Sequence, residues 1–151
     1  MVDRFERFSF AISEISRHWN KIAAYEMERY GLKGPCVLYL LAIHHHADGV
    51  TAAKLAEECG RDKADVSRAL ALMEQNGLVS KDSTHPYRAR LTLTAEGKQA
   101  AEHLQQRAAT AVSLGGEGLS DEQRTALYEI LERIAANLRT VSENGLPNEK
   151  G

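Results

Sequence analysis

Two adjoining segments decide the fold of this chain: Thr51-Ala52-Ala53-Lys54-Leu55-Ala56-Glu57, and then Asp62-Lys63-Ala64-Asp65-Val66-Ser67-Arg68-Ala69-Leu70. Thr51 is a good N-cap, so a helix is predicted over residues 52–59, and Gly60 closes it. Asp62 caps a second helix, which ends at Asn76-Gly77. The apolar residues of that helix recur at i, i+3, i+4 and i+7, which predicts one buried stripe of Val66, Ala69, Leu70 and Met73. Two short helices joined by Gly60-Arg61 form a helix-turn-helix pattern.

A hairpin is predicted directly after these helices, because the period of the apolar residues changes there. Residues 80–82 and 88–93 are expected to be strands, separated by the turn-rich Ser83-Thr84-His85-Pro86. In the second strand Ala89, Leu91 and Leu93 alternate with Arg88, Arg90 and Thr92. Since successive side chains of a strand point to opposite faces, we expect both arginines on the same, solvent-facing side.

Longer helices are predicted on both sides of this central region. One runs from Phe5 to Tyr30 and is closed by Gly31, and a short, largely buried one opens at Gly34-Pro35 and ends near Asp48-Gly49. Thr94 caps another helix that reaches about Leu114, and Ser120-Asp121-Glu122-Gln123 is a capping box for the last one. The first and last helices each have an apolar face, formed by Phe8, Ile12, Ile15, Trp19 and Ile22 and by Leu127, Ile130, Leu131, Ile134 and Leu138. The expected fold class is mainly α with a small β-hairpin.

Composition excludes several classes of protein. With 151 residues, 43% hydrophobic and 26% charged, the chain can form a core and is neither disordered, collagen-like nor a disulfide scaffold. Its longest apolar run, Cys36 to Ile43, is far short of the roughly 20 residues that cross a bilayer, and early charges interrupt any signal-peptide core. We therefore expect a soluble, cytoplasmic protein without membrane association.

Charge is distributed unevenly along the chain although the net charge is only −2. Residues 61–90 carry six basic and four acidic side chains, a net charge of +2, whereas residues 1–60 have a net charge of −1 and residues 91–151 one of −3. The helix-turn-helix and hairpin region is thus the basic part of the chain, which favours a nucleic-acid partner.

Two further segments complete the pattern: Leu72-Met73-Glu74-Gln75-Asn76-Gly77-Leu78-Val79 and Leu91-Thr92-Leu93-Thr94-Ala95-Glu96-Gly97-Lys98. In order and spacing, these elements resemble the MarR family of winged-helix transcriptional regulators over nearly the whole chain. The resemblance implies a winged helix-turn-helix DNA-binding lobe over residues 34–94. It also implies dimerisation helices over residues 1–33 and 95–142 and a flexible tail over residues 143–151, all in a single intertwined domain.

The function that the resemblance implies is regulation of transcription through sequence-specific binding of double-stranded DNA. A homodimer would present two recognition helices about 34 to 36 Å apart to a pseudo-palindromic promoter site. Repression by steric occupation of the promoter is the expected mechanism, and no cofactor is expected. A winged helix that contacts another protein instead of DNA is the main alternative.

The residues themselves agree with DNA binding. A helix with a short, basic outer face can enter the major groove, where Arg68 and Lys63 can reach guanine or phosphates. Ser67 can bond to either base edge, Ala64 allows close approach, and the helix N-terminus at Thr51 is a candidate phosphate anchor. The predicted DNA-binding set is Thr51, Arg61, Lys63, Ala64, Ser67, Arg68, Arg88 and Arg90. The structural alternative is a solvated, amphipathic surface.

The wing departs from the family pattern. Relatives commonly carry an Asp-x-Arg signature there, whereas residues 82–88 have no aspartate two positions before an arginine. Arg88 remains the candidate wing-tip arginine, but without its usual carboxylate brace. His85 and Tyr87 are candidates for other contacts.

Three kinds of switch are considered for the same fold. Relatives often respond to a small aromatic or anionic effector, and Trp19, Tyr25, Tyr30 and Tyr39 are candidates to line its crevice, although aromatics at helical spacing are more often core.

A metal-responsive regulator is a second possibility. Adjacent histidines on a helix point in different directions, so a metal site would need partners brought in by folding; its candidates are Cys36, His44 and His103. Redox sensing by Cys36 or Cys59 is the third, and two inert, partly buried thiols are the favoured interpretation. Catalysis is not expected, since the sequence has no GxxxxGK[ST], GxSxG or HExxH motif.

Overall fold

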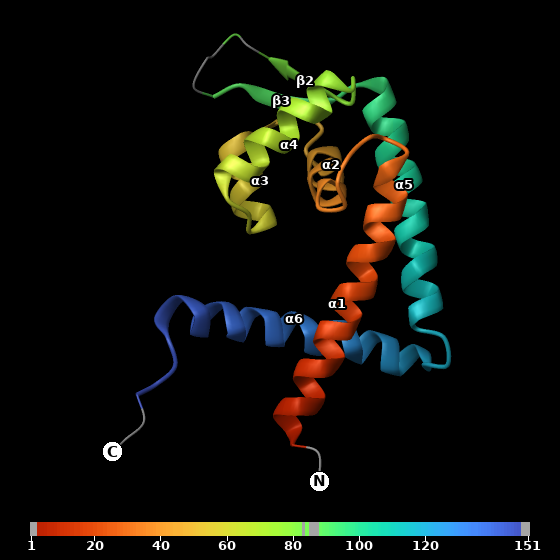
Figure 1. Ribbon diagram of the computed structural model, residues 1–151, viewed down its shortest axis with the longest axis vertical. Helices are drawn as coiled ribbons and strands as arrows, with labels where there is room; N and C mark the ends of the chain where they lie inside the picture. The colour runs from red at the N-terminus through yellow and green to blue at the C-terminus, as the bar shows by residue number, and fades with distance from the viewer. Residues whose placement is uncertain (1–2, 83, 85–87, 149–151) are drawn as a thin grey trace. The chain divides into compact units, whose positions relative to one another are not determined.

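A computed structural model describes residues 3–82, 84 and 88–148 of the chain (Figure 1). Its contacts divide the chain into two compact units, Met1–Ala109 and Thr110–Gly151. The first unit contains helices α1 to α4, a small sheet and most of α5, and the second contains the end of α5 and α6. The described residues are mainly helical with one antiparallel sheet, which confirms the predicted fold class.

Helix α1 (Arg4–Glu28) packs on the core of the first unit through its C-terminal end. Met27 is the one buried residue among those described in this helix. The predicted apolar face, from Phe8 to Ile22, is 41–65% exposed. The helix ends two residues before the predicted Tyr30, and the chain turns at Gly31, where φ is +67°. This left-handed value agrees with the predicted C-terminal glycine.

Helix α2 (Cys36–His45) lies in the core, with Cys36, Tyr39, Leu40 and Ile43 buried. Its predicted end near Asp48-Gly49 is wrong by about one turn. His46 already has a non-helical ψ of 77°, because the chain must leave the helix there to enter the strand β1 (Val50–Thr51).

Helices α3 (Ala52–Cys59) and α4 (Lys63–Gln75) have the predicted bounds. Leu55 and Ala56 of α3 and Val66, Leu70 and Met73 of α4 are buried, and they pack these helices on the core that α2 provides. The buried stripe of α4 is therefore confirmed, except that Ala69 is only half-buried.

The sheet has three antiparallel strands in the order β1-β3-β2, with β2 at Val79–Asp82 and β3 at Arg90–Leu93. Val79 pairs with Leu93, and Val50 pairs with Leu91. The alternation predicted for β3 is confirmed, since Arg90 is exposed while Leu91 and Leu93 are buried. The strand is shorter than predicted and leaves Arg88 outside it. Strand β1 was not predicted, because two extended residues between helices show no periodicity.

Helix α5 (Ala95–Gly115) begins at the end of β3, where Thr94 acts as the predicted N-cap. Thr94 Oγ1 accepts a hydrogen bond from Gly97 N at 3.0 Å and donates one to Gly77 O at 2.6 Å. Gly97 lies so close to the chain before β2 that an added Cβ would be 2.0 Å from Leu78 O. The start of α5 is thereby packed directly on the backbone that enters the hairpin.

Two polar contacts join α5 to the end of α1, and the two helices run side by side in Figure 1. Arg107 donates from Nε and Nη2 to Glu26 Oε1, both at 2.8 Å, and Arg29 Nη1 donates to His103 Nε2 at 2.8 Å. The contact with Glu26 raises the pKa of Arg107. Nearby on α5, Ala100, Ala101 and Leu104 are buried, so the N-terminal half of this helix packs on the core of the first unit.

The second unit contains helix α6 (Asp121–Asn144), which starts at the predicted capping box. Ser120 Oγ accepts from Gln123 N at 3.2 Å, and Gln123 Oε1 accepts from Ser120 N at 2.9 Å. None of the described residues of α6 is buried, and its predicted apolar face is largely exposed, with Ile130 at 55% and Leu138 at 52%. Residues 145–148 have no regular secondary structure, and the rest of the predicted flexible tail, residues 149–151, lies outside the described residues.

Across the described ranges, every helix is too short or too polar to span a lipid bilayer.

Candidate nucleic-acid interface

The turn between α3 and α4 sets how the two helices are presented. Thr51 Oγ1 accepts a hydrogen bond from Lys54 N at 3.2 Å and begins α3 as predicted. Gly60 ends it with φ at +60°, a conformation that disfavours any residue with a Cβ. Asp62 occupies the predicted N-cap position of α4, but its side chain makes no capping hydrogen bond. The first turn of α4 is thus held by its backbone and by the packing of Val66 on the core.

The outer face of α4 is open to solvent. Lys63, Ala64, Ser67 and Arg68 are all exposed, in keeping with the face expected from the sequence. Because α4 is buried only along Val66, Leu70 and Met73, the opposite face can approach a ligand as large as a duplex.

Two exposed ion pairs lie on α4 and α3, one within each helix. Arg68 donates from Nη2 to Asp65 Oδ1 within α4, and Lys54 Nζ lies 3.8 Å from Glu57 Oε2 within α3. Arg61 and Lys63 are exposed beside Lys54, and together with Gly60 they line a concavity of about 570 Å³ at the turn. Three cations and the carboxylate of Glu57 therefore line the turn, and the excess of positive charge suits phosphate groups.

The two wing arginines differ in their surroundings. Arg90 is turned toward the α2–β1 connection, where its Nη1 donates to the carbonyls of Asp48 and Gly49 at 3.4 and 3.5 Å. Arg88 is exposed and lies outside the strand. The sequence predicts Arg88 and Arg90 on one solvent-facing side. Both side chains are exposed, but Arg90 also donates hydrogen bonds to backbone carbonyls of the protein.

The region that lacks the Asp-x-Arg signature is only partly described. Asp82 Oδ1 accepts a hydrogen bond from Thr84 N at 3.1 Å, so this carboxylate supports the turn of the hairpin. Ser83 and residues 85–87, which include the candidate contacts His85 and Tyr87, lie outside the described residues.

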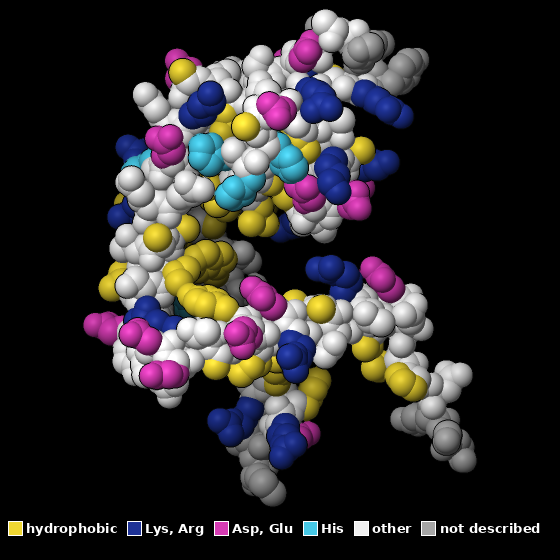
Figure 2. Space-filling model, turned by 180° about the vertical axis from the view of Figure 1, so that it is seen from behind, with side chains coloured by type: hydrophobic (Ala, Val, Ile, Leu, Met, Phe, Trp, Pro, Cys, Tyr) yellow, Lys and Arg dark blue, Asp and Glu magenta, His cyan; other side chains and the backbone are white. Residues whose placement is uncertain are grey.

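A groove of about 580 Å³ separates α4 from the wing. It is lined by Ser67 and Glu74 of α4, Lys81 of β2, Arg88 and the start of α3 at Thr51. Three of the eight predicted DNA-binding residues, Thr51, Ser67 and Arg88, meet in this groove, and the other five do not line it. On the rear face of the lobe, Figure 2 shows Lys and Arg side chains interspersed with carboxylates at the edge that carries α3, α4 and the hairpin.

Lys81 and Glu74 were missed by the sequence interpretation, although both line the groove. Lys81 belongs to the basic segment 61–90 and to a predicted strand, so strand alternation could have placed it. Glu74 follows Ser67 by seven positions, which puts the two on one face of α4. Lys54 at the turn was missed in the same way.

The four aromatic candidates for an effector crevice have different environments. Tyr39 is a core residue at 2% exposure, and burial raises the pKa of its hydroxyl. Tyr30 is half-buried beneath the guanidinium of Arg29, whereas Trp19 and Tyr25 are 42% and 74% exposed. The concavity at Tyr25 is lined by Glu26, Glu28 and Arg29 and by none of the other three aromatics.

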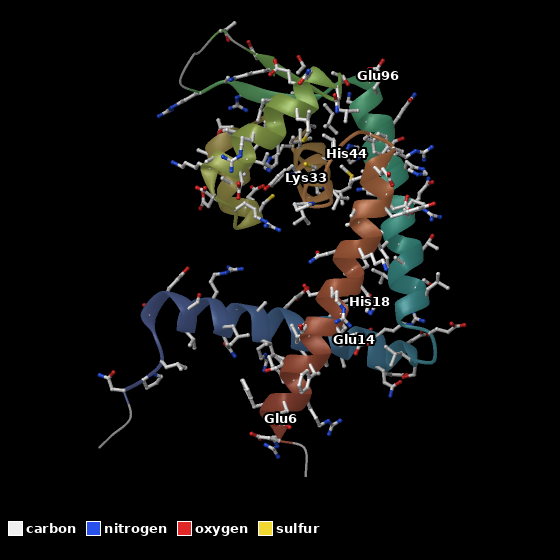
Figure 3. The ribbon with its side chains drawn as sticks, in the orientation of Figure 1. Glu6, Glu14, His18, Lys33, His44 and Glu96 are labelled. Carbon is white, nitrogen blue, oxygen red and sulfur yellow. The ribbon has the colours of Figure 1, made fainter. Side chains whose placement is uncertain are left out.

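The metal candidates are not brought together in the part of the chain that the structure describes, where no three His, Cys, Asp or Glu side chains form a metal-binding group. His103 accepts its hydrogen bond from Arg29, and His46 Nε2 lies 2.9 Å from Glu58 Oε2. His44 is on α2, well separated from His18 on α1 (Figure 3). Burial raises the pKa of both thiols, Cys36 and Cys59, which keeps them protonated and poorly reactive near neutrality.

The helix-turn-helix, the three-stranded wing and the exposed face of α4 define a winged helix-turn-helix protein. A model of the MarR family matches residues 30–89, the segment from α2 into the hairpin. The resemblance to the MarR family is thereby confirmed, and the chain has the fold of MarR-family transcriptional regulators. No protein of curated function matches the chain in sequence.

Solved structures extend the likeness to nearly the full chain. A MarR transcriptional regulator from Methanosarcina mazei Go1 is 21% identical, with a TM-score of 0.82 over 93% of this chain and 94% of that one. A regulator described as MarR family from Listeria monocytogenes, solved in complex with a 26mer DNA, is 21% identical, with a TM-score of 0.80 over 99% of both chains. A third, from Silicibacter pomeroyi, is 22% identical, with a TM-score of 0.74 over 90% of this chain and 92% of that one. These identities establish the shared fold.

Proposed function

We propose that this protein regulates transcription by binding double-stranded DNA in a sequence-specific manner. The observation that carries the proposal is the exposed face of α4, with Lys63, Ser67 and Arg68, beside a groove whose other wall holds Lys81 and Arg88. The 26mer DNA bound by the Listeria monocytogenes protein of the same fold supports the same partner here.

In this proposal α4 enters the major groove and its side chains contact base edges. Arg68 and Ser67 supply the donors, and Ala64 lets the helix backbone come close. Lys63, Arg61 and the N-terminus of α3 at Thr51 contact phosphates on one side. Arg88 contacts the backbone or the minor groove on the other side, and Arg90 contributes mainly by holding the wing to the α2–β1 connection.

The active species in this proposal is a homodimer. The apolar face of α1 is exposed and none of the described residues of α6 is buried, with Trp19 at 42%, Leu131 at 41% and Leu127 at 39% exposure. Water-exposed apolar stripes on two long helices favour association, because burying them is worth about 25 cal/mol per Å². A second copy of the chain offers the complementary stripes by symmetry, and two lobes then fit a pseudo-palindromic site.

Repression by occupation of a promoter is the proposed regulatory outcome, and a small aromatic or anionic effector is proposed to relieve it. Such an effector can act only if it binds one lobe arrangement more tightly than the other. Addition of aromatic carboxylates to the protein–DNA complex tests this response, and dissociation at concentrations that leave the fold intact is the supporting result.

The experiment that tests the proposal is selection of bound fragments from a random duplex pool at near-physiological salt, combined with the mass of the bound complex. Enrichment of an inverted repeat by two copies of the chain is the expected result. A matched pool incubated with an unrelated acidic protein controls for retention by the support.

Three other outcomes are informative. Enrichment of a sequence by a single copy of the chain would contradict the homodimer and still support DNA recognition. Retention without enrichment that vanishes as salt rises would mean that the lobe binds charge alone, because phosphate contacts weaken steeply with salt. Absence of any retention would favour the alternative of a winged helix that contacts a protein.

A further inference from the structure

We propose that Asp65 is a specificity-determining residue of the interface: it positions Arg68 to recognise guanine and lowers the affinity for DNA that lacks this guanine. The inference rests on the proposed function and adds one feature of the DNA site, a guanine recognised by Arg68. Asp65 belongs to no residue set predicted from the sequence.

The contact that carries the inference lies on the outer face of α4. Arg68 Nη2 donates to Asp65 Oδ1, and the two residues are three positions apart, so their side chains meet on one face of the helix. Both are solvent-exposed, with 72% of the Arg68 side chain and 54% of the Asp65 side chain accessible. The pair therefore lies on the surface that DNA would cover.

Stabilisation of the helix does not account for this pair. Ion pairs between such exposed side chains contribute very little to folding. Asp62 and Asp65 both place a carboxylate near the N-terminus of α4, where it interacts favourably with the helix dipole, and this interaction does not require Arg68. A second carboxylate on a phosphate-facing surface weakens binding to DNA in general, because it repels the backbone.

The pair instead affects DNA recognition, because it changes the orientation and the charge of the Arg68 guanidinium. A guanidinium has five N–H donors in a fixed plane, so one of them can bond to Asp65 while others remain free for O6 and N7 of guanine. Restricting the guanidinium in advance reduces the entropy lost when it meets the base. The carboxylate of Asp65 also offsets part of the positive charge of Arg68, so an Arg68 without its guanine gains less from the nearest phosphate.

Asp65→Asn tests the inference, and Asp62→Asn is its matched control. Each variant removes one negative charge from the first turn of α4, and asparagine remains a good N-cap residue. The two variants differ in one contact of the described residues: Asp65 pairs with Arg68, whereas Asp62 does not. Affinities for the selected wild-type site, for copies in which each guanine is replaced in turn, and for an unrelated duplex are compared at one salt concentration.

We expect Asp65→Asn to bind the unrelated duplex more tightly and to lose about tenfold of its preference for one guanine in each half-site, since one good bidentate contact discriminates by roughly this factor or more. Asp62→Asn should bind both duplexes more tightly and keep its preference. In an Arg68→Ala background, Asp65→Asn should change the guanine preference no further, because the residue to be positioned is gone.

An unchanged guanine preference in Asp65→Asn would overturn the role of Asp65 while leaving DNA recognition intact. Selection of no sequence by the wild type would instead remove the proposed function, and the guanine contact with it. An independent readout is the mobility of the Arg68 Nε–H group measured by NMR in the DNA-free protein. We expect it to increase in Asp65→Asn and not in Asp62→Asn, and equal mobility in wild type and Asp65→Asn would also overturn the positioning role.

Discussion

Replacing Gly97 by alanine is expected to destabilise the lobe, although the same change in an unconstrained helix is stabilising. Gly97 lies in the first turn of α5, where alanine is favoured over glycine by about 0.8 to 1 kcal/mol. In the folded chain an alanine Cβ would lie 2.0 Å from Leu78 O, whereas real contacts of this kind are essentially never shorter than 3.0 Å. The start of α5 and the entry to β2 must therefore separate by at least about 1 Å.

The cost of this separation follows from what Leu78 O does. It accepts a hydrogen bond from Thr94 N at 3.0 Å, which links the chain before the hairpin to the chain after it. Crowding in a packed region costs about 1 to 3 kcal/mol, and a weakened buried backbone hydrogen bond costs about 1 to 3 kcal/mol more. After subtraction of the helix-propensity gain, we expect a loss of about 1 to 5 kcal/mol, or roughly 2 to 20 °C in Tm for a chain of this size.

Urea and thermal unfolding followed by circular dichroism measure this loss, at one protein concentration because a dimer makes Tm concentration-dependent. Gly115→Ala is the matched control, since Gly115 is the last residue of the same helix and an added Cβ meets no heavy atom within 4 Å. It should leave stability unchanged or raise it by up to about 1 kcal/mol. A Gly97→Ala protein as stable as Gly115→Ala would refute the close approach of α5 to Leu78.

Three further predictions concern the interface, the helix cap and the buried thiol. Arg88→Ala should weaken binding to every duplex and reduce the slope of log K against log salt by about 0.9, whereas Arg139→Ala, which removes an exposed arginine of α6, should leave the slope unchanged; fluorescence anisotropy at several salt concentrations checks both, and equal slopes would remove Arg88 from the interface. Thr51→Ala should lower the free energy of unfolding by about 1 kcal/mol through loss of the Lys54 N–H bond, while Thr51→Ser should retain it; denaturant titrations that find no difference would contradict the cap. Burial raises the pKa of Cys36 above its ordinary value of 9.0, so this thiol ionises first in the unfolded chain. Its contribution to the free energy of unfolding should stay constant below about pH 9 and fall above it. Cys36→Ala should therefore remove part of the loss of stability above about pH 9 when unfolding is measured as a function of pH.

Local signals predicted most of the secondary structure correctly. The bounds of α3 follow from the Thr51 cap and the Gly60 end, and the start of α6 follows from the capping box at Ser120 and Gln123. Each of these signals acts within one helical turn, so no distant contact was needed to recognise it. The alternation of Arg90 and Leu91 in β3 was equally local.

Errors arose where a distant segment decides the local conformation. Strand β1 exists because Val50 pairs with Leu91, some 40 positions away, and this pairing also ends α2 at His45 rather than near Asp48. Arg90 looked equivalent to Arg88 in sequence, but the carbonyls of Asp48 and Gly49 hold it. Lys81 and Glu74 gained their place in the candidate site only when α4 and the hairpin came together to form the groove.

The sequence by itself determined the order of helices and strands, the buried stripe of α4 and the basic character of residues 61–90, because periodicity, caps and charge are properties of neighbouring residues. Only the tertiary structure decided which charges act together: the pairing of Asp65 with Arg68, the anchoring of Arg90 and the groove between Ser67 and Arg88. It also decides the sign of the change at Gly97, where helix propensity favours alanine and a carbonyl oxygen from another segment excludes it. Packing brings together groups that are far apart in sequence, and the energy of a close contact outweighs a local preference of about 1 kcal/mol.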